Sequence, residues 1–233
     1  MAERPVYIPK TEGPVLVKTE MIKFRWFAGM AISQKQKSIQ ALHEAAIARH
    51  LCRNPLEVSS KSPVEAGVAL SAFNLGSRTQ KSLRSFTVET AFQSSKVFEL
   101  GGPYRDLLYA TSREAKKDPR LRDSGRLMRF DFFGKSWGLE PKTAFYDWLY
   151  INTLSKNNDL VKELGVYDAF TDIEFNPEKS INCQAYSLAL FKALRSRDLL
   201  TEALSSPERF LDIVRSSAIS TAHESTDIQP RLV

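Results

Sequence analysis

Apolar and polar residues alternate along the chain in patterns that predict where its strands and helices lie. Around Phe24, apolar residues alternate with lysine and arginine, which is the pattern of a half-buried β-strand. The apolar positions of residues 34–51 and of residues 87–98 recur at the spacing of a helix. Val68 and Leu70 also alternate with other residues, so we expect a short strand there, ahead of the second helix.

The second half of the chain is predicted to be mostly helical. Helical spacing predicts helices at residues 104–117, 141–154, 160–164, 180–194 and 206–214, and a shorter apolar pattern predicts a strand at residues 170–175. The 233 residues are 42% hydrophobic, which is enough for one core, and no linker rich in Pro, Gly or Ser divides the middle. These features predict an α+β fold: a mostly helical single domain with a small β-sheet.

The two ends of the chain are expected to differ from the middle. Residues 1–20 are punctuated by proline and glycine, which predicts a loose arm or an edge strand. The domain itself is expected to cover residues 21–215. Residues 216–233 are polar and have no period, so they are predicted to form a disordered tail.

Charge and motif content narrow the class of function. Lysine and arginine exceed aspartate and glutamate by 33 − 27 = 6, and the pI near 9.3 suits a polyanionic partner. Walker A, strand-linked GxGxxG, GxSxG and HExxH motifs are absent, which argues against nucleotide-dependent kinases, Rossmann enzymes, serine hydrolases and zinc peptidases.

Cysteine, histidine and apolar content narrow it further. Two cysteines do not make a disulfide framework, and the three histidines are scattered, so we expect neither a metal nor another cofactor. No apolar run approaches the ~20 residues of a membrane span, and the first residues have no hydrophobic signal core. We therefore expect a cytoplasmic protein without a membrane partner.

A basic segment with aromatic residues, at residues 116–138, is a candidate nucleic-acid contact. Residues 105–142 hold ten Lys/Arg and six Asp/Glu, and so carry +4 of the net +6. A basic loop with aromatic side chains can follow a nucleic-acid backbone and stack on bases. The alternative is that the aromatic residues belong to the core. The candidate DNA-binding residues are Arg120, Arg122, Arg126 and Arg129.

Polar residues of the helix predicted at residues 87–98 form a candidate catalytic stripe. Glu89, Gln93 and Lys96 follow i, i+4, i+7 spacing, so a carboxylate, an amide and an amine share one side of the helix. The remaining positions are largely apolar and form the face to bury. The alternative is an ordinary solvated stripe. Residues 70–74, LSAFN, precede this helix and place small, aromatic and amide residues where a binding loop can begin.

Two other segments supply candidate ligand-binding groups. Lys35 and Lys37 lie in the first turn of the helix predicted at residues 34–51, where free N–H groups and two ammonium groups suit a phosphate. The alternative is two solvated lysines. Asp172 and Glu174 are two apart in the strand predicted at residues 170–175, so both should face the same side.

Four motifs of the chain resemble those of the NADAR superfamily, whose members act on ADP-ribose-related or ribosylamine compounds. LSAFN followed by TVETAFQSSKVF is similar to its paired signature of a binding loop and a helix that begins with Glu and carries Gln and Lys. SQKQKSIQALHEAA and FTDIEFNPEKSINCQA resemble one subfamily, the antitoxins paired with toxins that ADP-ribosylate guanine in DNA. The resemblance covers roughly residues 20–215.

The resemblance implies both a substrate and the residues that bind it. The substrate would be ADP-ribosylated guanine in DNA, with Glu89 and Lys96 as catalytic residues and the acidic residues after position 170 on ribose hydroxyls. The residues implied to bind ADP-ribose or guanine are Lys35, Lys37, Ser71, Phe73, Asn74, Gln93, Asp172, Glu174, Asn176 and Asn182, with Gln184 as a further hydrogen-bonding candidate.

The chemistry of these groups fits cleavage of an N-glycosidic bond. Positive charge develops at the anomeric carbon, and a carboxylate such as that of Glu89 stabilises it. Lys96 offers either a proton or a nucleophilic amine that opens the ribose as a Schiff base, and direct attack by water with help from Glu89 is the alternative.

The predicted function is hydrolysis of the ADP-ribosyl–guanine bond in DNA, as antitoxin to a DNA ADP-ribosyltransferase toxin. One alternative is an N-glycosidase acting on small ribosylamine nucleotides. Another is a non-catalytic module that binds ADP-ribose or neutralises the toxin by direct contact. The expected partners are ADP-ribosylated DNA and the cognate toxin.

Overall fold

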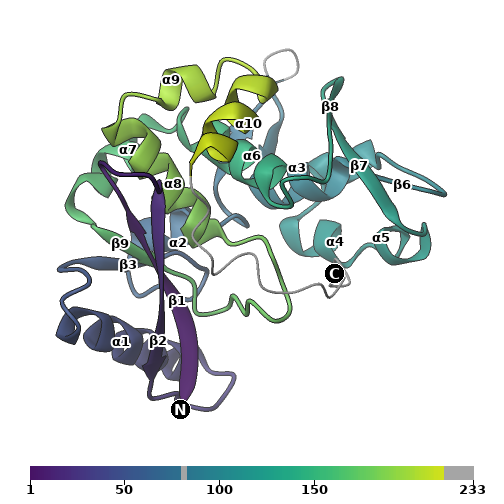
Figure 1. The fold of residues 1–233 in the computed structure, drawn as a ribbon. Helices are drawn as coiled ribbons and strands as arrows, with labels where there is room; N and C mark the ends of the chain where they lie inside the picture. The colour runs from purple at the N-terminus through teal and green to yellow at the C-terminus, as the bar shows by residue number, and fades with distance from the viewer. Residues whose placement is uncertain (80–82, 218–233) are drawn as a thin grey trace.

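The computed structural model describes residues 1–79 and 83–217, which form an α+β fold (Figure 1). The strands are β1 (Ala2–Pro9), β2 (Val17–Phe24), β3 (Pro55–Glu57), β4 (Gly76–Arg78), β5 (Ser85–Thr87), β6 (Lys96–Phe98), β7 (Leu127–Phe132), β8 (Lys135–Trp137) and β9 (Ala169–Thr171). The α-helices are α1 (Ile32–Ala48), α2 (Glu65–Ala69), α3 (Val88–Ser94), α4 (Ser112–Lys117), α5 (Arg120–Asp123), α6 (Ala144–Leu154), α7 (Asn158–Glu163), α8 (Gln184–Ser196), α9 (Leu200–Ala203) and α10 (Pro207–Ser216). Two 3-10 helices are η1 (Arg105–Tyr109) and η2 (Leu164–Val166). The predicted fold class is confirmed.

The largest sheet has the strand order β2-β1-β9-β3 and lies between two helices, α1 and α8 (Figure 1). β1 is antiparallel to β2 and β9, and β9 is parallel to β3. Successive residues of a strand point to opposite faces. Val6 therefore packs with the buried residues of α1, whereas its neighbour Tyr7 packs with those of α8.

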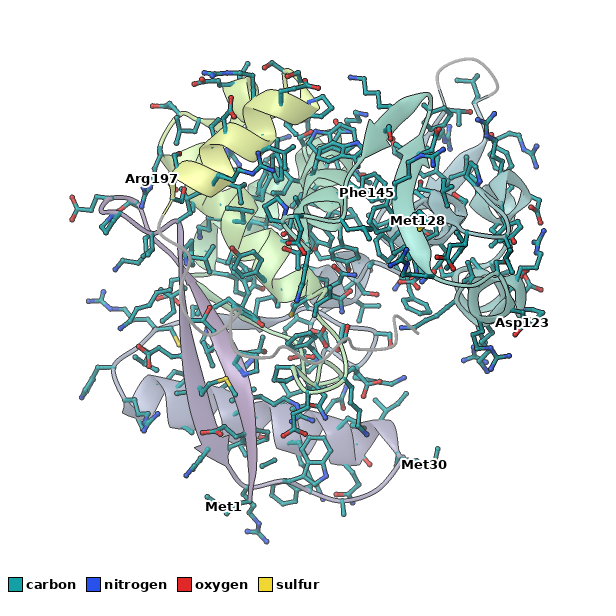
Figure 2. The ribbon with its side chains drawn as sticks, turned by 45° about the vertical axis from the view of Figure 1, so that its right-hand side comes forward. Met1, Met30, Asp123, Met128, Phe145 and Arg197 are labelled. Atoms are coloured by element: carbon teal, nitrogen blue, oxygen red, sulfur yellow. The ribbon has the colours of Figure 1, made fainter. Side chains whose placement is uncertain are left out.

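Helices α3 and α6 are buried almost along their whole length. All seven residues of α3 and ten of the eleven residues of α6 are buried. Phe145 of α6 lies at the centre of this half of the molecule (Figure 2), with its ring centroid 4.7 Å from that of Phe130 and 6.1 Å from that of Phe92. Because α3 is buried on every side, its polar side chains are held inside the protein.

The helix predicted at residues 87–98 is shorter than expected. Thr87 caps it as predicted, by accepting a hydrogen bond from the backbone N–H of Thr90, but α3 ends at Ser94. Lys96 is instead the first residue of β6 and pairs with Phe130 of β7. Hydrogen bonds to a strand distant in the sequence end the helix, and helical periodicity gives no sign of them.

Other segments also differ from the expectation. The strand expected at Val68 and Leu70 is the helix α2 with its C-terminal cap, and the helix expected at residues 104–117 divides into η1 and α4. The basic segment at residues 116–138 is not a loop, because α5, β7 and β8 occupy most of it.

The strand expected at residues 170–175 is wrong in its second part. β9 ends at Thr171, because Asp172 Oδ1 accepts hydrogen bonds from the backbone N–H groups of Glu174 and Phe175 and so forms a turn. Asp172 is buried and Glu174 is exposed. The two carboxylates therefore do not share one face of a strand.

The first residues of the chain are part of the main sheet. β1 lies between β2 and β9, so residues 2–9 are neither a loose arm nor an edge strand, whereas β2, which begins at Val17, lies at one edge of the sheet. The tail expected at residues 216–233 lies outside the described residues from residue 218 onward, and it stays a prediction.

Arg197, at the C-terminal end of α8, holds the turn between β1 and β2 (Figure 2). Its guanidinium group donates hydrogen bonds to the carbonyl oxygens of Lys10, Glu12, Gly13 and Val15, at 2.6 to 2.9 Å.

We expect Arg197→Ala to lower the free energy of unfolding by about 2 kcal/mol, since one charged group satisfies four carbonyls. Arg197→Lys should recover only part of this, because an ammonium group cannot reach all four. Chemical denaturation measures both. Arg195→Ala, which removes one exposed hydrogen bond, is the control and should change stability by less than about 0.5 kcal/mol. Equal losses in the two alanine variants would contradict the role of Arg197.

Candidate active site

The loop of residues 70–75 is fastened to the N-terminus of α3. The backbone N–H of Val88 donates to the carbonyl of Leu75 at 2.9 Å, and that of Glu89 donates to the carbonyl of Ala72 at 3.0 Å. The first amides of a helix have no partner within the helix. Here the loop satisfies two of them, so its position relative to the first turn of α3 is defined.

Glu89, Gln93 and Lys96 lie together beneath this loop, although Lys96 is on a strand. Gln93 Nε2 donates to Glu89 Oε1 at 2.9 Å, and Lys96 Nζ lies 5.0 Å from the ring centroid of Phe92. The exposed fractions are 6% for Glu89, 3% for Gln93 and 1% for Lys96. These groups are therefore buried, and the alternative of a solvated stripe is wrong.

Burial changes the protonation of Lys96. It lowers the pKa of Lys96 to about 8, with the Glu89 carboxylate acting against this shift and the Lys116 ammonium adding to it. At pH 7 roughly a tenth of the amine is then neutral, which is some hundreds of times more than for an ordinary lysine. A neutral amine close to a carboxylate can act as a nucleophile or exchange a proton.

Gln93 also presents an unused acceptor. Its Oε1 atom is buried and has no hydrogen-bond partner within residues 1–79 and 83–217. Buried amide oxygens are almost always hydrogen-bonded. The side-chain oxygen of Gln93 is therefore available, beside the carboxylate of Glu89, to accept a hydrogen bond from a hydroxyl or amine of a ligand.

Phe73 and Lys116 lie beside the buried group. Lys116 Nζ lies 5.3 Å from the ring centroid of Phe73, and its charge acts on Lys96. Ser112, also on α4, donates from its hydroxyl to the carbonyl of Phe73 at 2.9 Å. Helix α4 thus places an exposed cation next to an aromatic ring of the loop.

Asp172 and Tyr146 extend the site towards the main sheet. Tyr146 is buried on α6, and its pKa is raised by burial and by the charges of both Glu89 and Asp172. Burial likewise raises the pKa of Asp172. A single phenol is thus close to the carboxylates of α3 and of the turn after β9.

Gln184 joins three separate segments at this point. Its Oε1 atom accepts from the backbone N–H of Ala72 at 2.7 Å. Its Nε2 atom donates to the carbonyl of Val58 at 2.6 Å and to Asp172 Oδ2 at 3.0 Å. The first residue of α8 therefore holds the loop, the end of β3 and the turn after β9 in fixed relation. Because its amide is occupied, Gln184 positions the site rather than binding ribose.

Glu57 supports the same turn from inside the sheet. Its carboxylate accepts hydrogen bonds from the hydroxyls of Ser59 and Thr171 and from the backbone N–H of Ile173, at 2.6 to 2.9 Å. Burial and the nearby Asp172 raise the pKa of Glu57. Thr171 also lies 2.9 Å from His43 Nε2, and burial lowers the pKa of His43 to about 4. The network fixes where β9 ends, and so where Asp172 lies.

Lys35 is brought to the acidic turn, whereas its neighbour Lys37 is not. Lys35 Nζ forms an ion pair with Glu174 at 3.1 Å and lies 4.9 Å from the ring centroid of Trp26. Lys37 is exposed, and the structure shows no partner for it among the described residues. In this structure the two lysines do not form one phosphate site, because the carboxylate of Glu174 neutralises the charge of Lys35.

Ser71 and the asparagine candidates make mostly local hydrogen bonds. Ser71 accepts from the backbone N–H of Phe73 in the loop, but the Asn74 side chain donates away from it, to the carbonyl of Val68. Asn176 accepts from the backbone of a turn at residue 178. The Oδ1 atom of Asn182 is buried and, like Oε1 of Gln93, has no partner in the described part of the chain.

The candidate DNA-binding arginines divide into two pairs. Arg120 forms ion pairs with Asp106 and Asp118, and Arg126 pairs with Glu99. Arg122 and Arg129 are exposed, and no ion pair of theirs is seen among the described residues. The aromatic residues of this segment are mostly core, since Phe130 and Trp137 are buried, whereas Phe133 is 65% exposed.

Lys116, Tyr146 and Glu57 were not identified from the sequence. Lys116 is one of several lysines and arginines on α4 and α5, and no local pattern marks it. Tyr146 lies in an apolar run that is typical of a core helix. Glu57 is an isolated acid in a polar loop. Each becomes significant only through contacts with residues distant in the sequence.

Potential metal ligands are not clustered among the described residues. Within residues 1–79 and 83–217, no three His, Cys, Asp or Glu side chains are grouped as metal ligands. Cys52 and Cys183 are both free and buried. The same residues include no helix that is both long and apolar enough to cross a membrane.

Comparison with known proteins identifies one family. The family model described as the DarT1-associated NADAR antitoxin matches residues 2–224, which is almost the whole chain. A search of curated proteins found no matching relative. The match includes both the loop of residues 70–75 and the segment after β9.

We expect Gln184→Ala to lower the free energy of unfolding by about 2–4 kcal/mol, because it leaves buried groups at Ala72, Val58 and Asp172 without partners. Chemical denaturation measures the loss. Gln40→Ala is the matched control, since Gln40 bonds only to Glu44 on the surface of α1, and it should cost less than about 0.5 kcal/mol. A loss no larger than the control's would show that Gln184 does not hold the three segments together.

Proposed function

Because the chain belongs to the DarT1-associated NADAR antitoxin family, we propose that it hydrolyses the N-glycosidic bond between ADP-ribose and guanine in DNA. In this role it would reverse the modification made by its partner toxin. The family name itself implies a toxin partner. The nature of the bond and of the DNA substrate belongs to the proposal, as does the cytoplasm as its place of action.

One observation supports this activity most directly: the buried group of Glu89, Gln93 and Lys96. Cleavage at an anomeric carbon develops positive charge on the sugar, and a desolvated carboxylate stabilises that charge more strongly than one in water. Glu89 is 6% exposed and Lys96 is 1% exposed, so both act in a largely water-free environment.

Lys96 can provide the attacking group. In this route its neutral amine attacks the anomeric carbon, the bond to the guanine nitrogen breaks, and that nitrogen gains a proton. The sugar ring then opens to an imine with Lys96. Addition of water to the imine releases ADP-ribose and restores the amine. The lowered pKa of Lys96 supports this route, because the attack requires the uncharged form.

Attack by water is the alternative route. Glu89 would then stabilise the charge on the sugar, and Lys96 would donate a proton to the departing guanine. The buried acceptor of Gln93 suits a ribose hydroxyl in either route.

Residues around this group suit the rest of the substrate. Phe73 offers an aromatic face for a base, and the exposed ammonium of Lys116 suits a phosphate of the ADP-ribose. Asp172, Glu174 and Asn182 remain candidates for ribose hydroxyls. Binding of a phosphate at Lys35 would require the ion pair with Glu174 to open.

The proposal is tested by incubating the protein with single-stranded DNA that carries ADP-ribosylated guanine. We expect free ADP-ribose and unmodified DNA. Cleavage of small ribosylamine nucleotides alone would indicate the first alternative activity. Rescue of toxin-expressing cells by a folded variant without activity would indicate direct neutralisation of the toxin instead.

We expect Glu89→Gln to keep the fold but to reduce turnover by a factor on the order of 10² or more, because it removes the charge that stabilises the transition state. ADP-ribose affinity should be largely retained, which calorimetry would measure. Glu163→Gln, an exposed substitution of the same kind, is the control. Full turnover in Glu89→Gln would overturn the assignment of the site.

Lys96 should control the pH profile. If its neutral amine attacks the sugar, the turnover rate should rise with pH through about 8, and borohydride should trap a covalent adduct with ADP-ribose. Lys96→Ala should lose both the activity and the adduct, whereas Lys142→Ala should lose neither. A rate that falls above pH 8, without an adduct, would instead assign Lys96 the role of proton donor.

A further inference from the structure

A groove beside the candidate active site has a marked charge. Its volume is about 580 Å³, and it lies along the β4–β5 hairpin, with further walls from the end of α6 and from Ala110. Arg78 and Lys156 line it, and no aspartate or glutamate does. Neither of these two cations forms an ion pair in the part of the chain that the structure describes. The groove thus presents two cations that no described acidic residue neutralises, and this charge suits a polyanion.

The other lining groups also suit a nucleic-acid strand. Ser85 pairs with Arg78 and so lies on the same face of the two strands, and Ser85 and Asn157 supply neutral hydrogen-bonding groups, whereas the ring of Phe86 lies on the other face and packs against Phe132. Proteins that bind single strands combine a positive groove with aromatic rings on which bases stack. Arg84 directly precedes β5, and its guanidinium group lies 3.6 Å from the ring centroid of the exposed Tyr109. This pair adds a cation and an aromatic ring outside the groove.

The groove adjoins the buried Glu89 through shared structural elements. Thr87 lines the groove and is also the N-cap of α3, two residues before Glu89. Asn74 lines it from the loop that carries Phe73. Ser112 Oγ lies 2.8 Å from Thr87 Oγ1 and also donates to the carbonyl of Phe73. The groove thus adjoins the first turn of α3 and the loop that carries Phe73.

Glycine keeps the floor of the groove close to its neighbouring strand. A Cβ atom at Gly76 would lie 2.6 Å from the carbonyl oxygen of Phe86, so a larger residue would push β4 and β5 apart. Asn157 Nδ2 also donates to the carbonyl of Gly76 at 3.2 Å and joins the hairpin to the end of α6. These contacts hold Arg78 and Lys156 on a defined surface.

We propose that this groove binds the DNA strand on one side of the modified guanine, with Arg78 and Lys156 on its phosphates. The proposal rests on the proposed function. A guanine within a strand has nucleotides on both sides of it, so the strand must leave the active site along an adjoining surface. The groove is such a surface. Arg120 and Arg126 would have to break an ion pair to reach a phosphate, whereas the two cations of the groove would not.

The experiment compares two double variants with the same change in charge. Arg78→Ala/Lys156→Ala alters the groove, and Arg53→Ala/Lys23→Ala alters exposed residues elsewhere. Binding of an unmodified single-stranded oligonucleotide is measured over a range of salt concentrations. The groove variant should bind on the order of tenfold more weakly, and its salt slope should fall by roughly 1.4, about 0.7 for each lost phosphate contact. The control variant should bind like the wild type.

Kinetics provide a second measurement. The groove variant should have a higher KM than the wild type for an ADP-ribosylated oligonucleotide. Its KM for ADP-ribosyl-guanosine, which has no flanking nucleotides, should be unchanged. Absence of all cleavage by the wild type would refute the proposed function, and the binding measurement would still decide on the groove.

Three results would overturn the groove proposal. The first is an unchanged salt slope in the groove variant. The second is a slope that falls only in Arg122→Ala/Arg129→Ala, which would place the strand on the basic segment. The third is loss of binding to purified toxin with DNA binding intact, which would make the groove a protein contact.

Discussion

The burial of the Lys96 ammonium group is the constraint on which the rest of the site depends. A charge inside a protein is stable only when it is paired or when it gives up its proton. Glu89 on α3 supplies the opposite charge, and the lowered pKa of Lys96 shows that the compensation is partial. The protein therefore keeps a reactive amine in its interior, at a cost in stability that the surrounding core must offset.

The part of the core around α3 is aromatic, and this determines where the polar groups lie. Rings from α3, β7 and β8 pack around Phe145 of α6, so α3 is held in place before any ligand binds. The loop of residues 70–75 then covers the first turn of α3, and Gln184 fixes that loop relative to Asp172. The result is a preorganised set of groups, which is what stabilisation of a developing charge requires.

The surface charges must be judged by their partners and not by their sum. Arg120 and Arg126 are paired with neighbouring acids, so the number of basic residues in residues 105–142 overstates the free positive charge that this segment offers to a polyanion. The groove along β4 and β5 contains fewer cations, but none of its lining residues is acidic. Where nucleic acid is concerned, unpaired charge on a defined surface matters more than the total.

The sequence by itself determined the fold class, the helical cap at Thr87 and the family resemblance, and it singled out Glu89, Gln93 and Lys96 as candidates, because all of these depend on local order. Only the tertiary structure decided that α3 stops at Ser94 and that Lys96 belongs to β6, since pairing with β7 competes with the helix there. The tertiary structure also decided which side chains come together with Glu89 and Lys96 in the candidate active site. Tyr146 and Lys116 come from separate helices, and local periodicity carries no information on contacts between residues so far apart in the chain.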